Sequence, residues 1–169
     1  MSGVAAVDLN QLCREVAELT QPRWRDRSQA CGICVEMSLH LGEVGLVAGE
    51  PGPLREVLVN LVLNAVDAMP HGGAIELRTW ESAHGVHLSV ADTGTGMSEE
   101  IRRRALEPFF TTKGSQGMGL GLSVIHGTIQ RHRGGLSIES AEGKGTVVTI
   151  RLPRRSAAAQ VPAPSDAQR

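Results

Sequence analysis

Aromatic side chains are nearly absent from this chain of 169 residues, which has two Trp, two Phe and no Tyr. A surface that binds single-stranded nucleic acid by base stacking needs more aromatic rings than these. The formal net charge is only −1. We therefore expect no general affinity for nucleic acid or for anionic membranes.

The chain also lacks a long uninterrupted apolar segment. The longest apolar stretch, residues 57–69, contains two Asn and one Asp, whereas a membrane-spanning helix needs about 20 consecutive apolar residues. Residues 1–6 do not resemble a signal peptide. The sequence therefore predicts no direct membrane span.

Cysteine is scarce as well, with Cys13, Cys31 and Cys34. The last two have the Cys-x-x-Cys spacing of a redox pair or of half a zinc site. A zinc site requires a second pair of ligands at suitable spacing, and none follows. We expect Cys31 and Cys34 to be buried free thiols, in or beside a strand, in a reducing cytoplasm.

The length and the 41% apolar content indicate one domain with a substantial core. Residues 1–153 carry the periodic segments, and residues 154–169 are expected to form a disordered tail. Helices are expected from residue 9 into the twenties and at 54–69, 98–106 and 120–132; strands are expected at 33–39, 44–48, 74–80, 86–91, 136–140 and 146–152.

The expected helix at 54–69 carries an unusual polar stripe. Glu56, Asn60, Asn64 and Asp67 recur at helical spacing on an otherwise apolar segment. A solvated face would explain the stripe, but such faces usually collect Lys, Glu and Arg, and Asn is a poor helix former. A carbonyl oxygen of Asn can coordinate Mg²⁺, so the stripe favours a metal or ligand site.

Asp92 follows an apolar strand and opens the segment Asp-Thr-Gly-Thr-Gly-Met at residues 92–97. A carboxylate at this place can accept a hydrogen bond from an exocyclic amine such as that of adenine. Gly94 and Gly96 permit close backbone approach and positive φ. A simple β-turn is the alternative, because Asp-Thr-Gly suits one.

Two further motifs follow in order. Glu-Pro-Phe-Phe-Thr-Thr-Lys occupies residues 107–113, and Gly-Met-Gly-Leu-Gly-Leu occupies 117–122, directly before an expected helix. The start of a helix can hold phosphate through its free N–H groups and its dipole. The chain contains no Walker A sequence. The order of the motifs indicates a pocket for a purine nucleotide and its metal.

Together these motifs resemble the ATP-binding catalytic domain of sensor histidine kinases, within the superfamily that also includes gyrase, mismatch-repair ATPases and heat-shock chaperones. Residues 54–69 resemble the asparagine box, 92–96 the first glycine box, 107–113 the phenylalanine box and 117–122 the second glycine box, over a resemblance that covers residues 8–153. The resemblance implies an α/β two-layer sandwich of the Bergerat type, a mixed, mostly antiparallel sheet with helices on one face. The form of the third box is typical of the nitrogen-regulation-like branch.

The resemblance also implies roles for individual residues. Asn64 would be the Mg²⁺ ligand, Asn60 its polar companion, Asp92 the adenine reader and Lys113 a phosphate contact, with Asn60, Asn64 and Lys113 forming the catalytic set. Phe109 and Phe110 would anchor a lid over the nucleotide. The implied nucleotide-binding residues are Asn64, Asp67, Asp92, Gly94, Gly96, Met97, Phe110, Thr111, Thr112, Lys113, Gly117, Met118, Gly119, Leu120, Gly121, Leu122 and Thr146.

Two departures from the family pattern matter. Asp67 stands where many histidine kinases carry Lys or Arg. The signature of a phosphoacceptor in this family is a His followed by Glu or Asp. None of the six His in this chain is followed by either residue. The resemblance therefore implies an incomplete enzyme, a cytoplasmic kinase domain or the cytoplasmic portion of a membrane sensor. It would bind ATP or ADP with Mg²⁺ and phosphorylate a histidine on a separate dimerisation domain, which then serves a response regulator receiver domain in two-component signal transduction.

Two rival functions remain open. A gyrase-type ATPase needs a Glu as general base one turn before the metal-binding Asn, and this chain has Asn60 there, which cannot take a proton. An anti-sigma-like serine kinase or a non-catalytic ATP-binding module is the other alternative. The small size favours that alternative, whereas the complete third and fourth boxes favour a histidine kinase.

Overall fold

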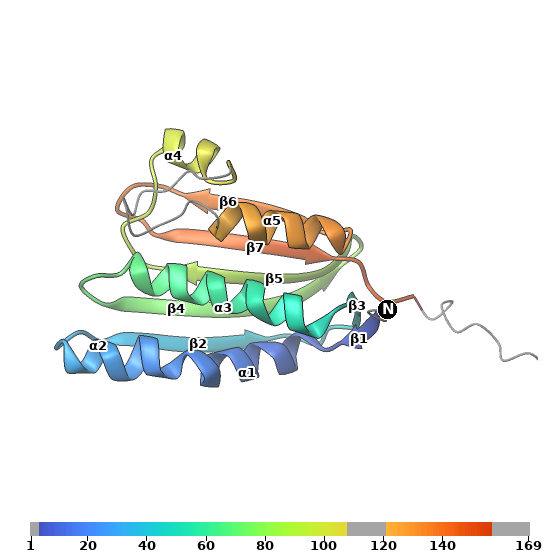
Figure 1. Ribbon diagram of the computed structural model, residues 1–169, viewed down its shortest axis with the longest axis horizontal. Coiled ribbons are helices and arrows are strands. Elements are labelled where there is room, and N and C mark those ends of the chain that lie inside the picture. The colour runs from blue at the N-terminus through green and yellow to red at the C-terminus, as the bar shows by residue number, and fades with distance from the viewer. Residues whose placement is uncertain (1–3, 108–120, 157–169) are drawn as a thin grey trace, which may run out of the picture.

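A five-stranded sheet covered by helices on one face forms the body of the protein (Figure 1). The computed structural model describes residues 4–107 and 121–156. The strands lie in the order β2 (Val35–Leu41), β4 (Gly73–Ser82), β5 (Gly85–Asp92), β7 (Thr146–Leu152) and β6 (Gly135–Ser140). β2 and β4 are parallel, and all other neighbours in this order are antiparallel. The predicted fold class is confirmed.

Helices α1, α3 and α5 lie side by side over this sheet, and α4 lies beyond its β6 edge (Figure 1). The helical segments are α1 (Leu9–Gln21), the π-helical η1 (Pro22–Asp26), α2 (Arg27–Ala30), α3 (Pro51–Asp67), α4 (Glu99–Arg104) and α5 (Gly121–Arg131). A separate two-stranded sheet pairs β1 (Ala5–Val7) with β3 (Val47–Gly49) in antiparallel fashion. Among the described residues, no helix combines the length and the apolar character that a membrane crossing requires.

Alternation along the strands decides which side chains face the helices. Thr79 marks the inner face, because its hydroxyl donates to Oδ1 of Asn10 in α1 at 2.6 Å. Ile75 and Leu77 belong to the same row of β4 and are fully buried. They pack in one core with Val86, Leu88, Val90, Val148, Ile150 and Leu152 of the sheet and with Leu12, Val16, Leu58, Val62, Ile125 and Ile129 of the helices. Each large apolar side chain in this core contributes roughly 1.5–3 kcal/mol relative to exposure.

Local signals account for the helix starts. The Asp8 carboxylate accepts hydrogen bonds from the N–H groups of Asn10 and Gln11, at 2.9 and 3.2 Å, and so caps α1. Ser98 caps α4 through the N–H of Ile101. The helix expected to begin at residue 54 begins at Pro51 instead, because proline is compatible with the first helical turn.

Three strand predictions needed correction. The strand expected at 44–48 is the shorter β3, which begins at Val47 and ends at Gly49. The strand expected at 33–39 runs from Val35 to Leu41, because its register is set by parallel pairing with β4, from Val35 opposite Gly73 to Leu41 opposite Thr79. The short strand β1 was not predicted at all. Its three residues are too few to show a period, and its pairing partner β3 lies some forty positions along the chain.

The prediction that Cys31 and Cys34 are buried was wrong, since both side chains are exposed. They flank the turn between α2 and β2, where nothing lies within 4 Å of the position that a Cβ on Gly32 would occupy. Cys13, on the inner side of α1, is fully buried. The sequence around these cysteines did not predict that they are exposed, because their exposure depends on how α2 and β2 are placed relative to each other.

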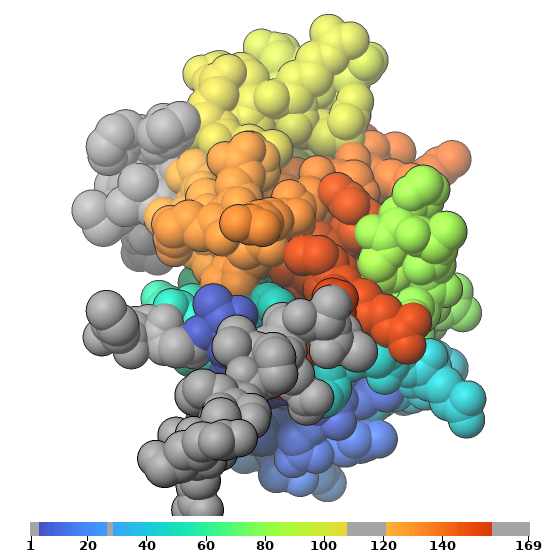
Figure 2. Space-filling view, turned by 90° about the vertical axis from the view of Figure 1, so that its right-hand side faces the viewer, coloured from blue at the N-terminus to red at the C-terminus, as the bar shows by residue number. Residues whose placement is uncertain are grey.

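Glu81 joins two other segments to the end of the sheet at which the β4–β5 hairpin turns. Its carboxylate accepts from the Gly45 N–H at 2.7 Å and pairs with the Arg154 guanidinium at 2.9 Å. Figure 2 shows the three segments concerned, the β4–β5 hairpin, the chain end after β7 and the connection before β3, next to one another on this end of the molecule. The N–H of Arg155 also donates to the Leu46 carbonyl at 2.8 Å. The domain boundary after residue 153 stays a prediction.

Candidate nucleotide site at the end of the sheet

Three polar residues lie at the ends of the neighbouring strands β5, β7 and β6, on the face of the sheet that meets the helices. Asp92 lies opposite Thr146, and Thr146 lies opposite Ser140. Residues opposite each other in antiparallel strands point to the same face, so these three side chains share the face of the buried core. The rows behind them are apolar: Val86, Leu88 and Val90 in β5, Leu152, Ile150 and Val148 in β7, and Leu136 and Ile138 in β6. The core therefore gives way to a polar corner at one end.

Ser140 joins the parts of this corner. Its Oγ accepts a hydrogen bond from the Met97 N–H at 2.8 Å, donates to the Gly145 carbonyl at 3.0 Å and lies 2.8 Å from Oγ1 of Thr146. One side chain thus connects the loop after β5 with the turn between β6 and β7. Sequence reasoning did not single out Ser140. The period-two pattern of β6 would have found it, because Ser140 occupies an inward position where the preceding inward residues are apolar.

The carboxyl group of Asp92 has a raised pKa. Burial raises the pKa of its carboxyl above the ordinary value of 3.8, and the backbone N–H groups of Gly94 and Thr146 offset part of that rise. The Gly94 N–H donates to Oδ1 at 2.9 Å, which is the Asx-turn geometry that the Asp-Thr-Gly sequence favours. The turn and the ligand interpretations of this motif are therefore compatible, since the turn uses only one of the carboxylate oxygens.

Gly94 and its neighbour fasten the loop after β5 to the end of α3. The Thr95 N–H donates to the Ala68 carbonyl at 2.9 Å, at the C-cap of α3. A Cβ on Gly94 would collide with that same carbonyl. Ala68 lies four residues beyond Asn64, a rise of about 6 Å along the helix. The first glycine motif and the asparagine stripe therefore meet at one end of α3.

Gly96 and Gly145 need glycine for two reasons. Their φ angles are +67° and +78°, in the left-handed region. A Cβ on Gly96 would collide with the Ala141 carbonyl, and one on Gly145 with the Asp92 carbonyl. The backbone at this corner is therefore packed as closely as glycine allows, and no side chain projects from these two positions beside Asp92 and Thr146.

Asn64 faces the start of α5. A Cβ on Gly121, the first residue of α5, would lie 3.7 Å from Nδ2 of Asn64. Asn60 and Asn64 are half-buried, whereas Glu56 and Asp67 at the two ends of the polar stripe are exposed. The middle of the stripe is therefore turned toward α5 and is not a plain solvated face. The metal and catalytic roles of these Asn residues stay predictions.

The predicted site residues thus fall into three groups. Asp92, Gly94, Gly96, Met97 and Thr146 meet at the polar corner. Asn64, Gly121 and Leu122 lie at the contact of α3 with α5, where Leu122 packs against the core, and Asp67 lies three residues beyond Asn64. The remaining predicted residues, Phe109, Phe110, Thr111, Thr112, Lys113, Gly117, Met118, Gly119 and Leu120, lie outside the described residues.

These elements come together at one end of the molecule (Figure 1). The end of α3, the end of β5, the β6–β7 turn and the start of α5 all lie on the left of that view. Within residues 4–107 and 121–156, no group of three or more His, Cys, Asp or Glu could hold a metal ion. A metal bound beside Asn64 would therefore be coordinated by the amide oxygen of that side chain, by water and by the nucleotide. This is the donor set that Mg²⁺ commonly has beside phosphate.

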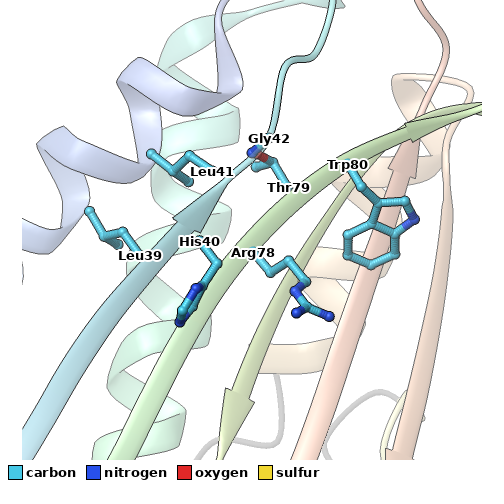
Figure 3. Close-up of a pocket in the computed structure, with 7 residues that line it drawn as sticks. All are labelled: Leu39, His40, Leu41, Gly42, Arg78, Thr79 and Trp80. Carbon is cyan, nitrogen blue, oxygen red and sulfur yellow. The ribbon is translucent and has the colours of Figure 1, made fainter.

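A separate depression lies on the outer face of the sheet. Figure 3 shows His40, Arg78 and Trp80 on one side of β2 and β4, with Leu41 on the other. It is remote from the polar corner because Asp92 pairs with Ile75, near the start of β4, and faces the helices. The depression is open and lined mainly by exposed strand residues, so it is not the candidate site.

His132 has a structural role. Its Nε2 accepts a hydrogen bond from the Glu50 N–H at 3.1 Å, and its Nδ1 lies 2.8 Å from the Thr128 carbonyl. A Cβ on Gly49 would collide with the same ring. The ring therefore joins the end of α5 to the start of α3.

Comparisons with known proteins agree with this architecture. A family model described as histidine kinase-, DNA gyrase B- and HSP90-like ATPase matches residues 49–156. Sporulation kinase A of Bacillus subtilis is 34% identical over 149 residues, which cover 88% of this chain and 24% of that protein. Sensor histidine kinase ZraS of Escherichia coli K12 is 35% identical over 148 residues, which cover 88% of this chain and 30% of that protein.

Solved structures give the same result. The crystal structure of full-length ShkA in complex with AMPPNP has a TM-score of 0.79 and 29% identity, covering 93% of this chain and 32% of that one. The catalytic domain of histidine kinase ThkA has a TM-score of 0.76 and 30% identity, covering 89% of this chain and 95% of that one.

The chain spans about a quarter to a third of the length of those curated relatives. Its assignment to the nitrogen-regulation-like branch stays a prediction. The family model covers well over half of the chain, and the predicted resemblance is confirmed. The chain therefore belongs to the histidine kinase-, DNA gyrase B- and HSP90-like ATPase family.

Proposed function

We propose that this domain binds ATP with Mg²⁺ and donates the γ-phosphoryl group to a histidine on a separate dimerisation domain. The observation that carries the proposal is the polar corner formed by Asp92, Thr146 and Ser140 at the end of three apolar rows. Such a corner, with the backbone of Gly96 and Gly145 beside it, suits a flat ring that needs hydrogen bonds at its edge. The sensor histidine kinases among the relatives support the same function.

Asp92 has the chemistry of an adenine reader. Its carboxylate only accepts hydrogen bonds when it is ionised, and one oxygen is already occupied by the Gly94 N–H. The Thr146 N–H also bonds to this carboxylate. Its two oxygens offer about four acceptor sites, so sites remain for an exocyclic amine. Guanine presents a carbonyl where adenine presents this amine, and a carbonyl would repel the carboxylate. We therefore propose a preference for adenine over guanine nucleotides.

Asn64 and the start of α5 fit the phosphate end of the same ligand. The amide of Asn64 lies beside Gly121, and the first N–H groups of an α-helix have no partner within the helix. A bound Mg²⁺ would supply charge neutralisation to the phosphates. Asn64 would orient the triphosphate toward α5, and Lys113, which lies outside the described residues, would add a positive charge.

Hydrolysis by this domain alone should be slow. A water molecule needs a general base to become a good nucleophile. The residue one turn before Asn64 is Asn60, whose amide cannot accept a proton. Phosphoryl transfer to an imidazole requires positioning and charge neutralisation more than a protein base, so the same site can serve a histidine acceptor.

The acceptor would come from another domain or chain. None of the six histidines in this sequence precedes an acidic residue. We propose a dimerisation domain with a His-Glu or His-Asp sequence as the direct partner, a response regulator receiver domain downstream, a cytoplasmic location and membership of the nitrogen-regulation-like branch.

The test incubates the purified chain with radiolabelled ATP and Mg²⁺, alone and together with purified dimerisation domains taken from several relatives. We expect no label on the chain itself, slow release of ADP and acid-labile label on an added domain. The control is the same domain with its acceptor His→Gln, which should remain unlabelled.

Other results would change the assignment. Acid-labile label on one of the chain's own histidines would overturn the need for a separate acceptor. Rapid ADP release would favour a gyrase-type ATPase, and label on a serine of an anti-sigma-antagonist protein would favour a serine kinase. Tight ATP binding without transfer to any of these partners would favour a non-catalytic module.

A further inference from the structure

Cys31 and Cys34 are exposed thiols that the nucleotide site does not use. They lie in the turn between α2 and β2, with two residues between them in a Cys-Gly-Ile-Cys sequence. No third His, Cys, Asp or Glu joins them within the described part of the chain to form a metal site. Exposure and pairing together favour redox chemistry over a packing role.

We propose that Cys31 and Cys34 form a thiol–disulfide exchange site that a low-molecular-weight disulfide oxidises to an intramolecular disulfide. One thiolate attacks a sulfur of the small disulfide, forms a mixed disulfide and releases one small thiol. The second cysteine then attacks the protein sulfur of that mixed disulfide and releases the other small thiol. The protein loses two protons and two electrons, and the small disulfide gains both.

The turn between the two cysteines favours ring closure. Gly32 lies in a turn between the thiols with φ of +73°, and its N–H donates to the Gln29 carbonyl at 3.0 Å. Nothing lies within 4 Å of a Cβ built on Gly32. The turn is therefore open to a reagent and is not locked by side-chain packing around its centre. A short connection also gives the second thiol a high effective concentration at the mixed disulfide.

One hydrogen bond connects this site to the start of β4. The Cys34 carbonyl accepts from the Gly73 N–H at 3.0 Å. Gly73 packs against Met69, and the next N–H, that of Ala74, donates to Oγ1 of Thr93 at 3.0 Å. Ring closure that moves the Cys34 backbone would change the Gly73 hydrogen bond. The exchange rate of the Gly73 amide is therefore a local readout of the oxidation state.

Cys13 provides an internal control. It is fully buried, and burial raises the pKa of its thiol to about 12. A thiolate is the reactive form, so Cys13 should not react in the folded protein. Any thiol that reacts under native conditions is then Cys31 or Cys34.

The experiment treats the reduced, folded chain with oxidised glutathione, then unfolds it in denaturant at acid pH, alkylates the remaining thiols on return to neutral pH and measures the intact mass. We expect a product that has lost two hydrogens, carries no glutathione and retains one alkylated thiol, Cys13. This product should exceed the mixed disulfide by roughly tenfold or more. The variants Cys31→Ser and Cys34→Ser cannot close the ring and should each carry one glutathione. The Gly73 amide should change its exchange rate in the wild type and not in either variant.

Two results would overturn the proposal. A wild-type chain that carries glutathione on both cysteines would show that the two sulfurs do not reach each other. Oxidation that links two chains through these cysteines would show that they act between molecules. Neither result bears on ATP binding, so the nucleotide assignment is tested separately.

Discussion

Ser140 and Thr146 lie opposite each other with their side-chain oxygens 2.8 Å apart. A serine hydroxyl has one proton, and Ser140 gives it to the Gly145 carbonyl. Thr146 must then be the donor in the contact between the two hydroxyls. Its oxygen keeps a lone pair for another donor, beside the carboxylate of Asp92. The corner thus presents two acceptors on one side, which suits an aminopurine such as adenine.

Replacing Ser140 should loosen this arrangement. In Ser140→Ala the Met97 N–H loses its acceptor, and Thr146 is released to reorient. We expect ADP affinity to fall about three- to tenfold, close to the cost of one lost hydrogen bond. Calorimetry with ADP measures the change. The matched control is Ser137→Ala, on the exposed side of the same strand, which should bind as the wild type does. Equal affinity of the two variants would exclude a positioning role for Ser140.

Removing the Asp92 carboxylate should cost more. Asp92→Ala leaves the ligand amine without its acceptor in a partly buried site, at roughly 1.5–3 kcal/mol, or about ten- to a hundredfold in ADP affinity. Calorimetry on a variant whose circular dichroism matches the wild type measures it. Unchanged affinity would remove Asp92 from the site.

Asp92 should also lower the stability of the free protein. Its pKa is raised by burial, so the folded state binds this proton more tightly than the unfolded state. Stability therefore falls as the pH rises through the raised pKa. Asp92→Asn removes the buried charge, and we expect a higher free energy of unfolding at pH 7. The gain should vanish below the ordinary carboxyl pKa of 3.8. Urea unfolding across this pH range gives both numbers, and a loss of stability at pH 7 would contradict the expectation.

Asn64 should matter most when metal is present. A ligand role predicts that Asn64→Ala weakens ATP binding in Mg²⁺ about tenfold, the loss of one charge-assisted contact, and much less in a chelator. The control is Glu56→Ala, an exposed member of the same polar stripe, which should leave both affinities unchanged. Equal losses with and without Mg²⁺ would indicate that Asn64 supports the fold and does not bind the metal.

A pair of glycines separates steric crowding from backbone strain. Gly143 and Gly145 both have positive φ, +74° and +78°. A Cβ on Gly143 meets open space, whereas one on Gly145 collides with the Asp92 carbonyl. Gly143→Ala should cost about 1–2 kcal/mol from φ alone. Gly145→Ala should cost clearly more and also weaken ADP binding. Thermal unfolding and calorimetry test both, and equal costs would mean that the β6–β7 turn adapts freely.

The sequence by itself determined the elements and the order of the motifs. The long helix around Asn60 and Asn64 and the hairpin that ends in Asp92 follow from local periodicity and from glycine at the turns, which act between near neighbours in the chain. The motifs at 92–97 and 107–122 identified the family in this order, because close approach of backbone to a ligand requires glycine at fixed spacing.

The tertiary structure decided which distant residues meet. Ser140 gains its role only because β6 pairs with β7 and β7 with β5, which brings it into line with Asp92. The exposure of Cys31 and Cys34 likewise depends on how α2 departs from the edge strand β2. Strand pairing and burial depend on contacts between residues far apart in sequence, and a local pattern does not encode which strand lies beside which.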